Sequence, residues 1–249
     1  MLPNVSYIVE NKGVLYEPYV ESTGSYVAVD LGLPSGTKWA NMNVGATSPE
    51  DPGLYFQWGD TVGYTIEELQ NNDIVSGMND FNNYFDGTPV TGFKKYDKNK
   101  LLRLESSDDA ASVHMGGSWR MPTSEELNEL FNMTTKTRYD EDWNEITSSN
   151  PRPGSVKYVK FNSRYNDNSI VFWYSGECDG VYKPSISENM QLKLWSSDLN
   201  NTWTDEYPNI YMFAKNQQMN FQGNIGGSDS NNQSQSYRYY CLPIRGVCK

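Results

Sequence analysis

Histidine and cysteine are scarce in this sequence, which has one His and three Cys among 249 residues. A Ser-His-Asp or Cys-His mechanism would depend on His114 alone. A zinc site would need His114 together with Cys178, Cys241 and Cys248, whose spacing contains no CxxC pair. An odd number of cysteines permits at most one internal disulfide, which excludes a disulfide-rich scaffold. We therefore expect no enzymatic activity, no metal and no other cofactor.

Basic residues and long apolar runs are also lacking. The 20 Lys and Arg are outnumbered by 31 Asp and Glu, which gives a net charge of -11, and no basic cluster occurs. Nucleic-acid binding is not expected, because it needs a positive surface. No stretch approaches the roughly 20 apolar residues of a membrane span, so none is expected. The first residues, MLPNVSYIVENKG, have no basic start followed by an apolar run, so we expect no secretory signal.

Aromatic residues, by contrast, are abundant. They make up 14% of the chain, with 18 Tyr and 7 Trp, whereas hydrophobic residues of all kinds reach only 37%. This aromatic content is too high for a disordered chain and indicates a loop-rich fold with a core of large rings. The length fits one large domain with at most a small appendage.

Residues 1–25 are expected to form a separate N-terminal segment. Two runs of alternating apolar and polar residues, 5–9 and 14–20, flank Asn11-Lys12-Gly13, a pattern typical of a β-hairpin. A lone hairpin is marginally stable in water, so this one should pack on the main domain or on a neighbouring chain and serve in assembly. The main domain is then expected over residues 26–249.

The main domain is expected to be an α+β fold of mixed, mostly antiparallel strands with two helices and long loops. One helix is predicted over 107–115, with a polar cap and acidic residues at its start and Gly116 after its end. A second is predicted over 122–131, where Thr123 and Glu126 form a capping box. Residues 71–100 indicate a long surface excursion. The predicted strands are 26–31, 37–40, 54–60, 156–162, 169–174, 192–196, 210–214 and 237–247.

The segment 216–236 is unusual in composition. Of its 21 residues, 17 are Asn, Gln, Ser or Gly, none is Lys or Arg, and Asp229 is the only acid. Composition alone favours a flexible, solvated loop. The alternative is a binding surface, because amides, hydroxyls and aromatic rings supply adaptable hydrogen bonds and rigid contact area.

Several motifs resemble, in order, a domain common in gut bacteria and their phages. They are VDLGLPSGTKWA (29–40), NVGA (43–46), YFQWGDT (55–61), DDAA (108–111), GGSWRMPT (116–123), LWSS (194–197), YRYY (237–240) and IRGV (244–247). The domain has a C-type-lectin-like fold. It is similar to formylglycine-generating enzymes and to the variable proteins of diversity-generating retroelements. The resemblance covers about residues 26–249.

This resemblance implies a ligand-binding function. In the variable proteins, a C-terminal segment is hypermutated at adenines of a template, so that Asn codons become codons for many other residues. The fold displays the varied side chains, and in phages such proteins lie at the tail tip and bind the host-cell receptor. The variable region here would be about 198–240. The activity of the formylglycine-generating relatives is not carried over, because Cys178, Cys241 and Cys248 do not reproduce a cysteine pair on the relevant motif.

The residues expected to contact the ligand are polar and aromatic side chains after Ser197, with Tyr and Trp as anchors and Asn as adaptable contacts. Strand alternation should turn about half of them inward. They are Asn200, Asn201, Trp203, Asp205, Tyr207, Asn209, Asn216, Asn220, Asn224, Asn231, Asn232, Tyr237 and Tyr239.

Three other features each have a structural and a functional interpretation. His114, late in a helix, is expected to be structural, because no motif supplies a partner for catalysis. Trp195 is expected to be a core ring and Ser196 and Ser197 to turn the chain, rather than to present a ligand surface. The acidic residues among 140–145 could hold a hard cation. A solvated acidic loop is favoured, because the carboxylates lack ligand spacing.

The resemblance also implies partners. A phage tail-tip protein would bind a protein or glycan receptor on the bacterial surface and would be joined to tail or baseplate proteins of the virion. Weak individual sites would gain avidity from display on a homo-oligomer such as a trimer. The alternative is an adhesin or lectin of the same fold on the bacterial cell surface. A third, less favoured hypothesis is an enzyme on the formylglycine-generating type of fold, which would require a metal or a reactive cysteine pair in a pocket.

Overall fold

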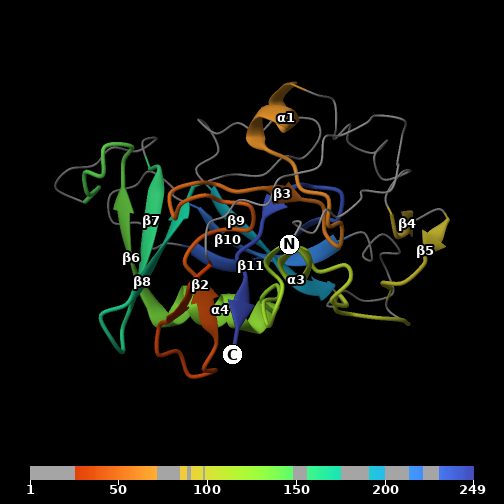
Figure 1. Cartoon of the computed structure of the whole chain (residues 1–249), viewed down its shortest axis with the longest axis horizontal. Helices are drawn as coiled ribbons and strands as arrows, with labels where there is room; N and C mark the ends of the chain where they lie inside the picture. The colour runs from red at the N-terminus through yellow and green to blue at the C-terminus, as the bar shows by residue number, and fades with distance from the viewer. Residues whose placement is uncertain are drawn as a thin grey trace, which may run out of the picture.

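The computed structural model describes residues 26–71, 85–88, 91–97, 99–147, 156–174, 191–199, 213–220 and 230–249. The β-hairpin expected within residues 1–25 lies outside them. Described strands outnumber described helices, and every ladder between two named strands is antiparallel (Figure 1). The expected α+β class with mostly antiparallel strands is therefore confirmed.

The first and last strands share one small sheet. Strands β1 (Ala28–Asp30) and β13 (Val247–Cys248) both pair with β2 (Lys38–Ala40). Trp39 in β2 lies opposite Val29 and Val247, and both Trp39 and Val247 are fully buried. Just before β13, strand β12 (Leu242–Pro243) pairs with β3 (Tyr55–Phe56). The C-terminal segment is thus fixed against the start of the main domain.

A second sheet lies at one end of the molecule, on the left in Figure 1. It contains β6 (Thr134–Tyr139), β7 (Tyr158–Ser163) and β8 (Ser169–Trp173) in that order. Alternate residues of β7 and β8 are buried in the largest core cluster, as period-two strands with one covered face require. Strand β6 was not expected, because its sequence TTKTRY contains no aliphatic residue.

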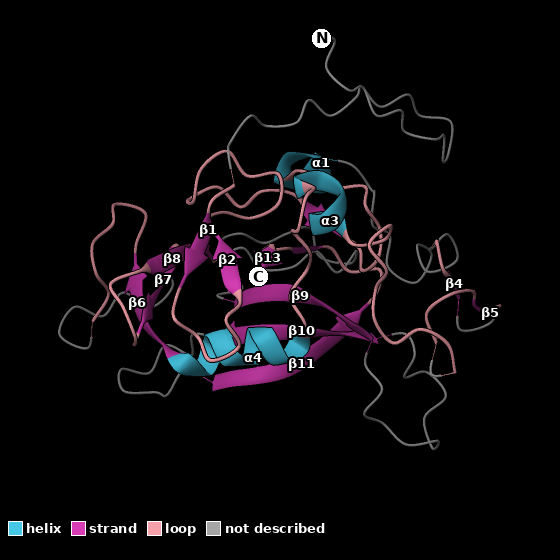
Figure 2. Cartoon of the chain, turned by 60° about the horizontal axis from the view of Figure 1, so that its bottom comes forward, coloured by secondary structure: helices cyan, strands magenta, loops and turns pink. Residues whose placement is uncertain are grey.

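The third sheet has the order β11-β10-β9, formed by β9 (Gln191–Leu199), β10 (Phe213–Asn220) and β11 (Ser230–Tyr237). Helix α4 (Ser124–Met133) packs against it (Figure 2). Leu127, Leu130 and Phe131 of α4 share a core cluster with Leu192 and Leu194 of β9. This contact explains why the apolar residues of α4 lie on one face.

The helix predictions are partly confirmed. Thr123 caps α4 and forms the expected capping box, although Pro122 lies before the cap rather than in the first turn. Helix α3 (Ala110–Met115) starts later than predicted, because Asp109 is the N-cap and accepts from the backbone N of Ser112 at 2.8 Å. Gly116 ends α3 with a φ of 67°, as expected. Helix α1 (Ile66–Asn71) was not expected.

Two further predictions are wrong. The described part of the segment expected to be a surface excursion is anchored in the core, since Asp86, Phe93 and Tyr96 are at most 5% exposed. Between these residues, β4 (Gly87–Thr88) and β5 (Gly92–Phe93) form a short hairpin, on the right in Figure 1. The strand expected over 237–247 is interrupted, because β11 ends at Tyr237 and only the two-residue strands β12 and β13 follow.

The core is rich in large rings, as predicted. Trp39, Trp58 and Trp195 have no exposed surface, and the rings divide between two main clusters. Among the residues described, no helix has both the length and the apolar character needed to cross a membrane.

Candidate ligand-binding face

Strand β9 is the fixed support of the amide-rich tract (residues 216–236), because it pairs with β10. The Trp195 ring is fully buried, and its Nε1 donates a hydrogen bond to the carbonyl of Phe56 at 2.8 Å. The Nε1 of Trp58 donates in turn to the carbonyl of Ser196 at 2.9 Å. The expectation that Trp195 is a core ring is confirmed. The expectation that Ser196 and Ser197 turn the chain is wrong, because both lie inside β9.

The end of β9 is held by the start of α4. Asp198 is 6% exposed and accepts hydrogen bonds from the backbone N of Ser124 at 2.7 Å and from Arg103 Nε at 2.6 Å. The backbone N of Ser197 donates to the carbonyl of Pro122 at 2.8 Å. Leu199 is 1% exposed. The first two residues of the expected variable region, 198 and 199, therefore belong to the framework.

Arg238, directly after β11, holds the C-terminal end of the tract. Its side chain is fully buried, pairs with Asp86 at 3.2 Å and donates to the carbonyl of Tyr96 at 2.9 Å. Its guanidinium carbon lies 3.9 Å from the centre of the Phe93 ring. The Arg238 carbonyl accepts from the backbone N of Trp58 at 2.8 Å. Sequence reasoning assigned no role to Arg238 or Asp86, because a contact across 152 positions leaves no local pattern.

The tract itself forms paired strands. Eight consecutive pairs join β10 and β11, from Phe213 with Tyr237 to Asn220 with Ser230. The interpretation of residues 216–236 as a loop is therefore wrong for residues 216–220 and 230–236, which belong to strands, while residues 221–229 lie outside the described part. Strand β9 supplies the third member of the ladder, with one irregularity between Ala214 and Asn216.

Six of the 13 expected contact residues lie in the described part. The backbone register divides four of them between the two faces of the sheet β11-β10-β9. Asn216 pairs with Trp195, whereas Asn231 pairs with Met219, which pairs with Leu192. Because successive pairs alternate between faces, Asn216, Asn220 and Asn232 share one face and Asn231 lies on the other. The expected contact residues outside the described part are Asn200, Asn201, Trp203, Asp205, Tyr207, Asn209 and Asn224.

The two tyrosines at the end of the tract differ in exposure. Tyr237 is half-buried, and its ring lies 5.3 Å from that of Tyr239 at an angle of 23°. Tyr239 is only 5% exposed and shares an apolar cluster with Tyr55 and Cys241, with Tyr240 packed against it. In this arrangement Tyr237 can offer part of its ring to a ligand, whereas Tyr239 mainly supports its neighbours.

His114 and the cysteines lie in packed surroundings. The His114 Nε2 is 2.8 Å from the carbonyl oxygen of Thr61, and its ring centre is 5.3 Å from that of Phe56. These contacts join α3 to the loop after β3 and suit the structural role expected for His114. Cys241 and Cys248 are both buried, and Cys178 lies outside the described residues.

The acidic loop after β6 is only partly solvated. Glu141, Asp142 and Glu145 are exposed, as expected. Asp140, however, is 4% exposed and accepts from the backbone N atoms of Asp142 and Asn144, at 3.0 and 2.9 Å. The prediction of a solvated acidic loop is therefore wrong for Asp140. In the described part of the chain, no three His, Cys, Asp or Glu side chains are grouped so that they could hold a metal ion.

Comparisons of the chain with protein families, with curated proteins and with solved structures found no match.

Proposed function

We propose that the chain is a ligand-binding protein of the C-type-lectin-like fold, which attaches a phage tail to a protein or glycan on a bacterial surface. One observation carries this proposal: the amide-rich strands β10 and β11 are supported by buried contacts along one edge and at one end. Trp195 and Asp198 fix β9, which pairs with β10, and Arg238 fixes the chain directly after β11. The partners of these contacts all lie outside the tract, so residues within the tract can vary while the supports remain.

The residues that carry the sequence resemblance support the fold assignment. Trp39, Trp58, Trp195 and Arg245 come from four of its motifs, and all are fully buried. Arg245 donates to Asn43 Oδ1, a residue of another of these motifs, at 2.8 Å. The motifs therefore build the framework, which is the role that a scaffold for variable side chains requires.

The chemistry of the tract suits non-covalent recognition. Asn, Gln and Ser on β10 and β11 bring both donors and acceptors, and Tyr237 adds part of an aromatic ring. Contacts of this kind are weak one by one. Display on a homo-oligomer would raise the avidity, with residues 1–25 joining the chain to sister chains or to the tail.

A cell-binding assay tests the proposed face. Labelled full-length protein is mixed with intact cells of a panel of gut bacteria, and retained protein is measured. The test variant carries N216A, N220A and N232A, which share one face of the sheet. The control variant carries N128A and N132A, which remove one hydrogen bond of 2.8 Å between exposed or half-exposed amides on α4.

We expect the natural protein and the control to bind the same strains and the test variant to bind at least tenfold less, with unchanged circular dichroism. Retention by no strain, or equal retention of the test variant, would contradict the proposal. The gene adds a second test. DNA flanking a diversified gene should contain a near-copy of the segment for residues 198–240 that differs only at adenines. Neighbouring tail genes favour the phage protein, whereas an isolated surface-protein gene favours the adhesin.

A further inference from the structure

Strand β11 is the outermost strand of the third sheet. In the order β11-β10-β9 it lies at the margin (Figure 2), and in the described part of the chain no strand pairs with its other side. Its eight pairs with β10 contain no register shift, so the edge runs without a bulge over Ser230–Tyr237. An edge of this kind presents a row of backbone N–H and C=O groups to any strand that approaches it.

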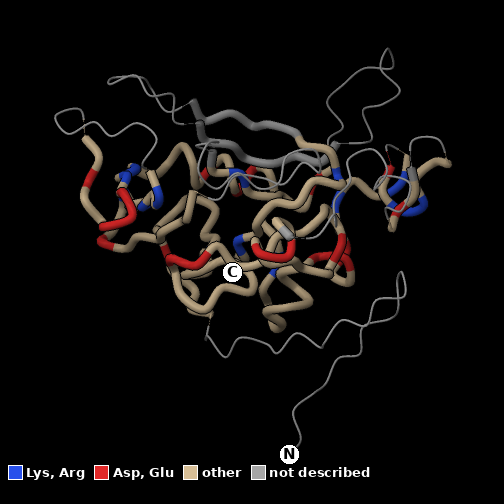
Figure 3. The backbone as a smooth tube through the Cα atoms, turned by 90° about the horizontal axis from the view of Figure 1, so that it is seen from above, with Lys and Arg blue, Asp and Glu red and all other residues tan. Residues whose placement is uncertain are grey.

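The sequence of β11 contains none of the residues that usually prevent such pairing. Natural proteins protect edge strands with charged residues, above all Lys, or with Pro. The sequence SNNQSQSY of β11 has no Lys, Arg, Asp, Glu or Pro. Charged residues make up 20% of the chain, and they lie along much of the other described backbone in Figure 3. The edge is therefore neutral in a chain whose net charge is -11.

Both edges of the first sheet, by contrast, are covered by other parts of the chain. The carbonyl of Asp30 in β1 accepts hydrogen bonds from the side-chain amides of Asn166 and Asn168, at 3.0 and 2.7 Å. In β13, Val247 exchanges two backbone hydrogen bonds with Arg120, at 2.8 and 3.0 Å. These contacts occupy backbone groups that would otherwise be available to another strand.

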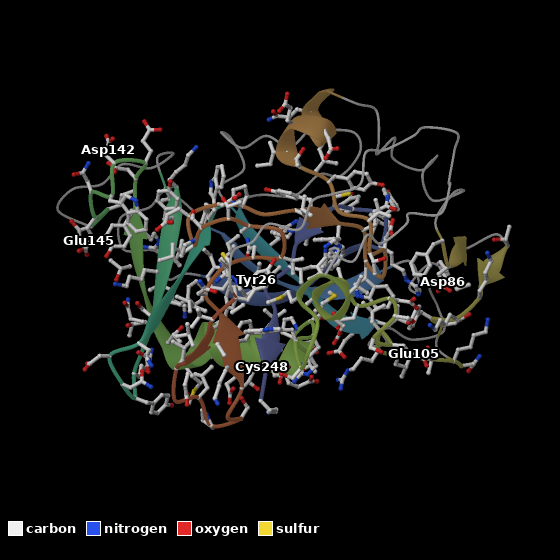
Figure 4. All side chains as sticks on the ribbon, viewed as in Figure 1. Tyr26, Asp86, Glu105, Asp142, Glu145 and Cys248 are labelled. Carbon is white, nitrogen blue, oxygen red and sulfur yellow. The ribbon has the colours of Figure 1, made fainter. Side chains whose placement is uncertain are left out.

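The edges of the second sheet are covered in the same way. At the end of β6, Tyr139 forms an antiparallel bridge with Glu145, which is labelled in Figure 4. In β8, the carbonyl of Val171 accepts a hydrogen bond from Arg245 Nη2 at 2.7 Å. The edge of β11 therefore differs from the edges of the first and second sheets.

The opposite edge of the third sheet is closed, which limits how far the sheet can grow. The backbone N of Ser197 in β9 donates to the carbonyl of Pro122 at 2.8 Å, and that of Leu199 donates to the carbonyl of Leu102 at 2.9 Å. A chain that adds to β11 therefore finds no second open edge at β9. Pairing of identical chains through β11 ends at two copies and does not continue into a fibre.

We propose that β11 pairs antiparallel with β11 of a second copy of the chain, so that two three-stranded sheets become one sheet in a symmetric dimer. A two-fold axis perpendicular to the sheet keeps each face of β11 on the same side of the dimer. Asn, Gln and Ser then lie opposite Asn, Gln and Ser, which both donate and accept hydrogen bonds. No like charges meet within the paired strands, although each chain carries a net charge of -11.

The dimer does not rest on the proposed ligand-binding function, because the strands pair without a ligand. It has a consequence for that function, however. The face shared by Asn216, Asn220 and Asn232 would occur twice on the same side of the joined sheet, and both copies of α4 would lie on the opposite side or at its margin. Two identical faces in one plane are the arrangement that raises avidity for a receptor displayed on a surface.

The test measures the mass of the full-length protein in solution without any ligand. Sedimentation equilibrium at a series of concentrations gives the dissociation constant of the dimer. The variant N232K/S234K brings like charges together in the middle of the paired strands, and N232E/S234E does the same with acids. The control S118K/Y165K adds as much charge as the first variant, at two exposed positions outside the described strands.

We expect the natural protein and the control to form dimers of equal stability, and each charged variant to have a dissociation constant at least tenfold higher. An equal mixture of the two charged variants should regain the dimer, because Lys then lies opposite Glu. This recovery also shows that both variants fold. A monomer at every concentration, a trimer, fibres, a dimer that both charged variants leave unchanged, or a mixture that stays monomeric would overturn the proposal.

Hydrogen exchange shows whether the dimer forms through the edge of β11. Amide N–H groups of alternate residues in an antiparallel strand point to the same neighbour, so half of those in β11 point away from β10. These amides should exchange at least tenfold more slowly in the natural dimer than in N232K/S234K. Fast exchange of these amides in the dimer would place the contact elsewhere. Slow exchange in a monomer would mean that another segment of the same chain covers the edge. Either result would overturn the proposal.

Discussion

Arg238 and Asp86 form an ion pair in which neither side chain is more than 1% exposed, with 3.2 Å between Nη1 and Oδ2. Asp86 also accepts from the backbone N atoms of Lys95 and Tyr96, at 2.7 and 2.9 Å. One carboxylate therefore organises the segment after β5 and also holds the end of β11. The pair joins the part of the chain expected to be a surface excursion to the part expected to bind ligand.

Removal of the Asp86 charge should destabilise the protein strongly. In D86N the guanidinium of Arg238 stays buried without a counter-charge, and uncompensated buried charges cost about 3–5 kcal/mol. The free energy of unfolding, measured by urea denaturation, should fall by that amount. Asp97 is near in sequence and only half-buried, so D97N is a suitable control and should change stability much less. A loss below about 1 kcal/mol for D86N would show that the pair does not anchor the tract.

Arg245 is a second buried arginine, and its role depends on the shape of its guanidinium group. It donates to Asn43 Oδ1, to the carbonyl of Ala40 and to the carbonyl of Val171, at 2.8, 2.9 and 2.7 Å. Its guanidinium carbon lies 4.2 Å from the centre of the Phe172 ring. Burial lowers the pKa of Arg245. The fork of N–H donors thus joins β2, the following loop and β8.

Replacement of Arg245 by lysine should therefore be costly although the charge is kept. Nε, Nη1 and Nη2 of Arg245 each serve one acceptor, whereas a lysine ammonium has all its N–H groups on one nitrogen. Each buried acceptor left without a donor costs about 1–3 kcal/mol. R245K should lower the free energy of unfolding by roughly 2–4 kcal/mol. R164K, at an exposed arginine in the turn between β7 and β8, should have almost no effect. If the two variants unfold at the same urea concentration, this account of Arg245 is wrong.

Local signals in the sequence predicted local structure well. The capping box of Thr123 and Glu126, with apolar residues at helical spacing, was sufficient to predict α4. A similar signal was missed at α1, where Thr65 and Glu68 exchange side-chain and backbone hydrogen bonds in the same pattern. The helix that follows has only six residues, so it shows no clear apolar periodicity.

Long-range contacts could not be predicted in this way. The buried pair of Asp86 and Arg238 has no signature at either position, and Asp86 follows a stretch rich in Asn that is typical of loops. The amide-rich tract shows the same limit. Asn, Gln and Ser are compatible with a solvated loop and with a strand, and the ladder with β9 decides between them.

Glu126 should make the stability of the protein depend on acid pH. Burial acts to raise its pKa, but hydrogen bonds from Arg120, from the backbone of Thr123 and from Thr37, with the charge of Arg120, outweigh burial and lower the pKa to about 2. Its side chain is 10% exposed, and Arg120 Nη2 lies 2.6 Å from its Oε1.

The sign follows from proton binding. Between pH 4.5 and about 2 the unfolded chain binds a proton at Glu126 and the folded chain does not, so this contribution is complete above pH 4.5 and is lost as pH falls toward 2. The pKa difference corresponds to about 3 kcal/mol. E126Q should lower the free energy of unfolding at pH 7 by about 2–3 kcal/mol and flatten its decline between pH 4.5 and 2. E125Q, at a neighbouring carboxylate with a 73% exposed side chain, should leave the decline unchanged. Thermal unfolding at a series of pH values measures the stability of both variants. Parallel stability curves for the natural protein and E126Q would refute the assignment of this pH dependence to Glu126.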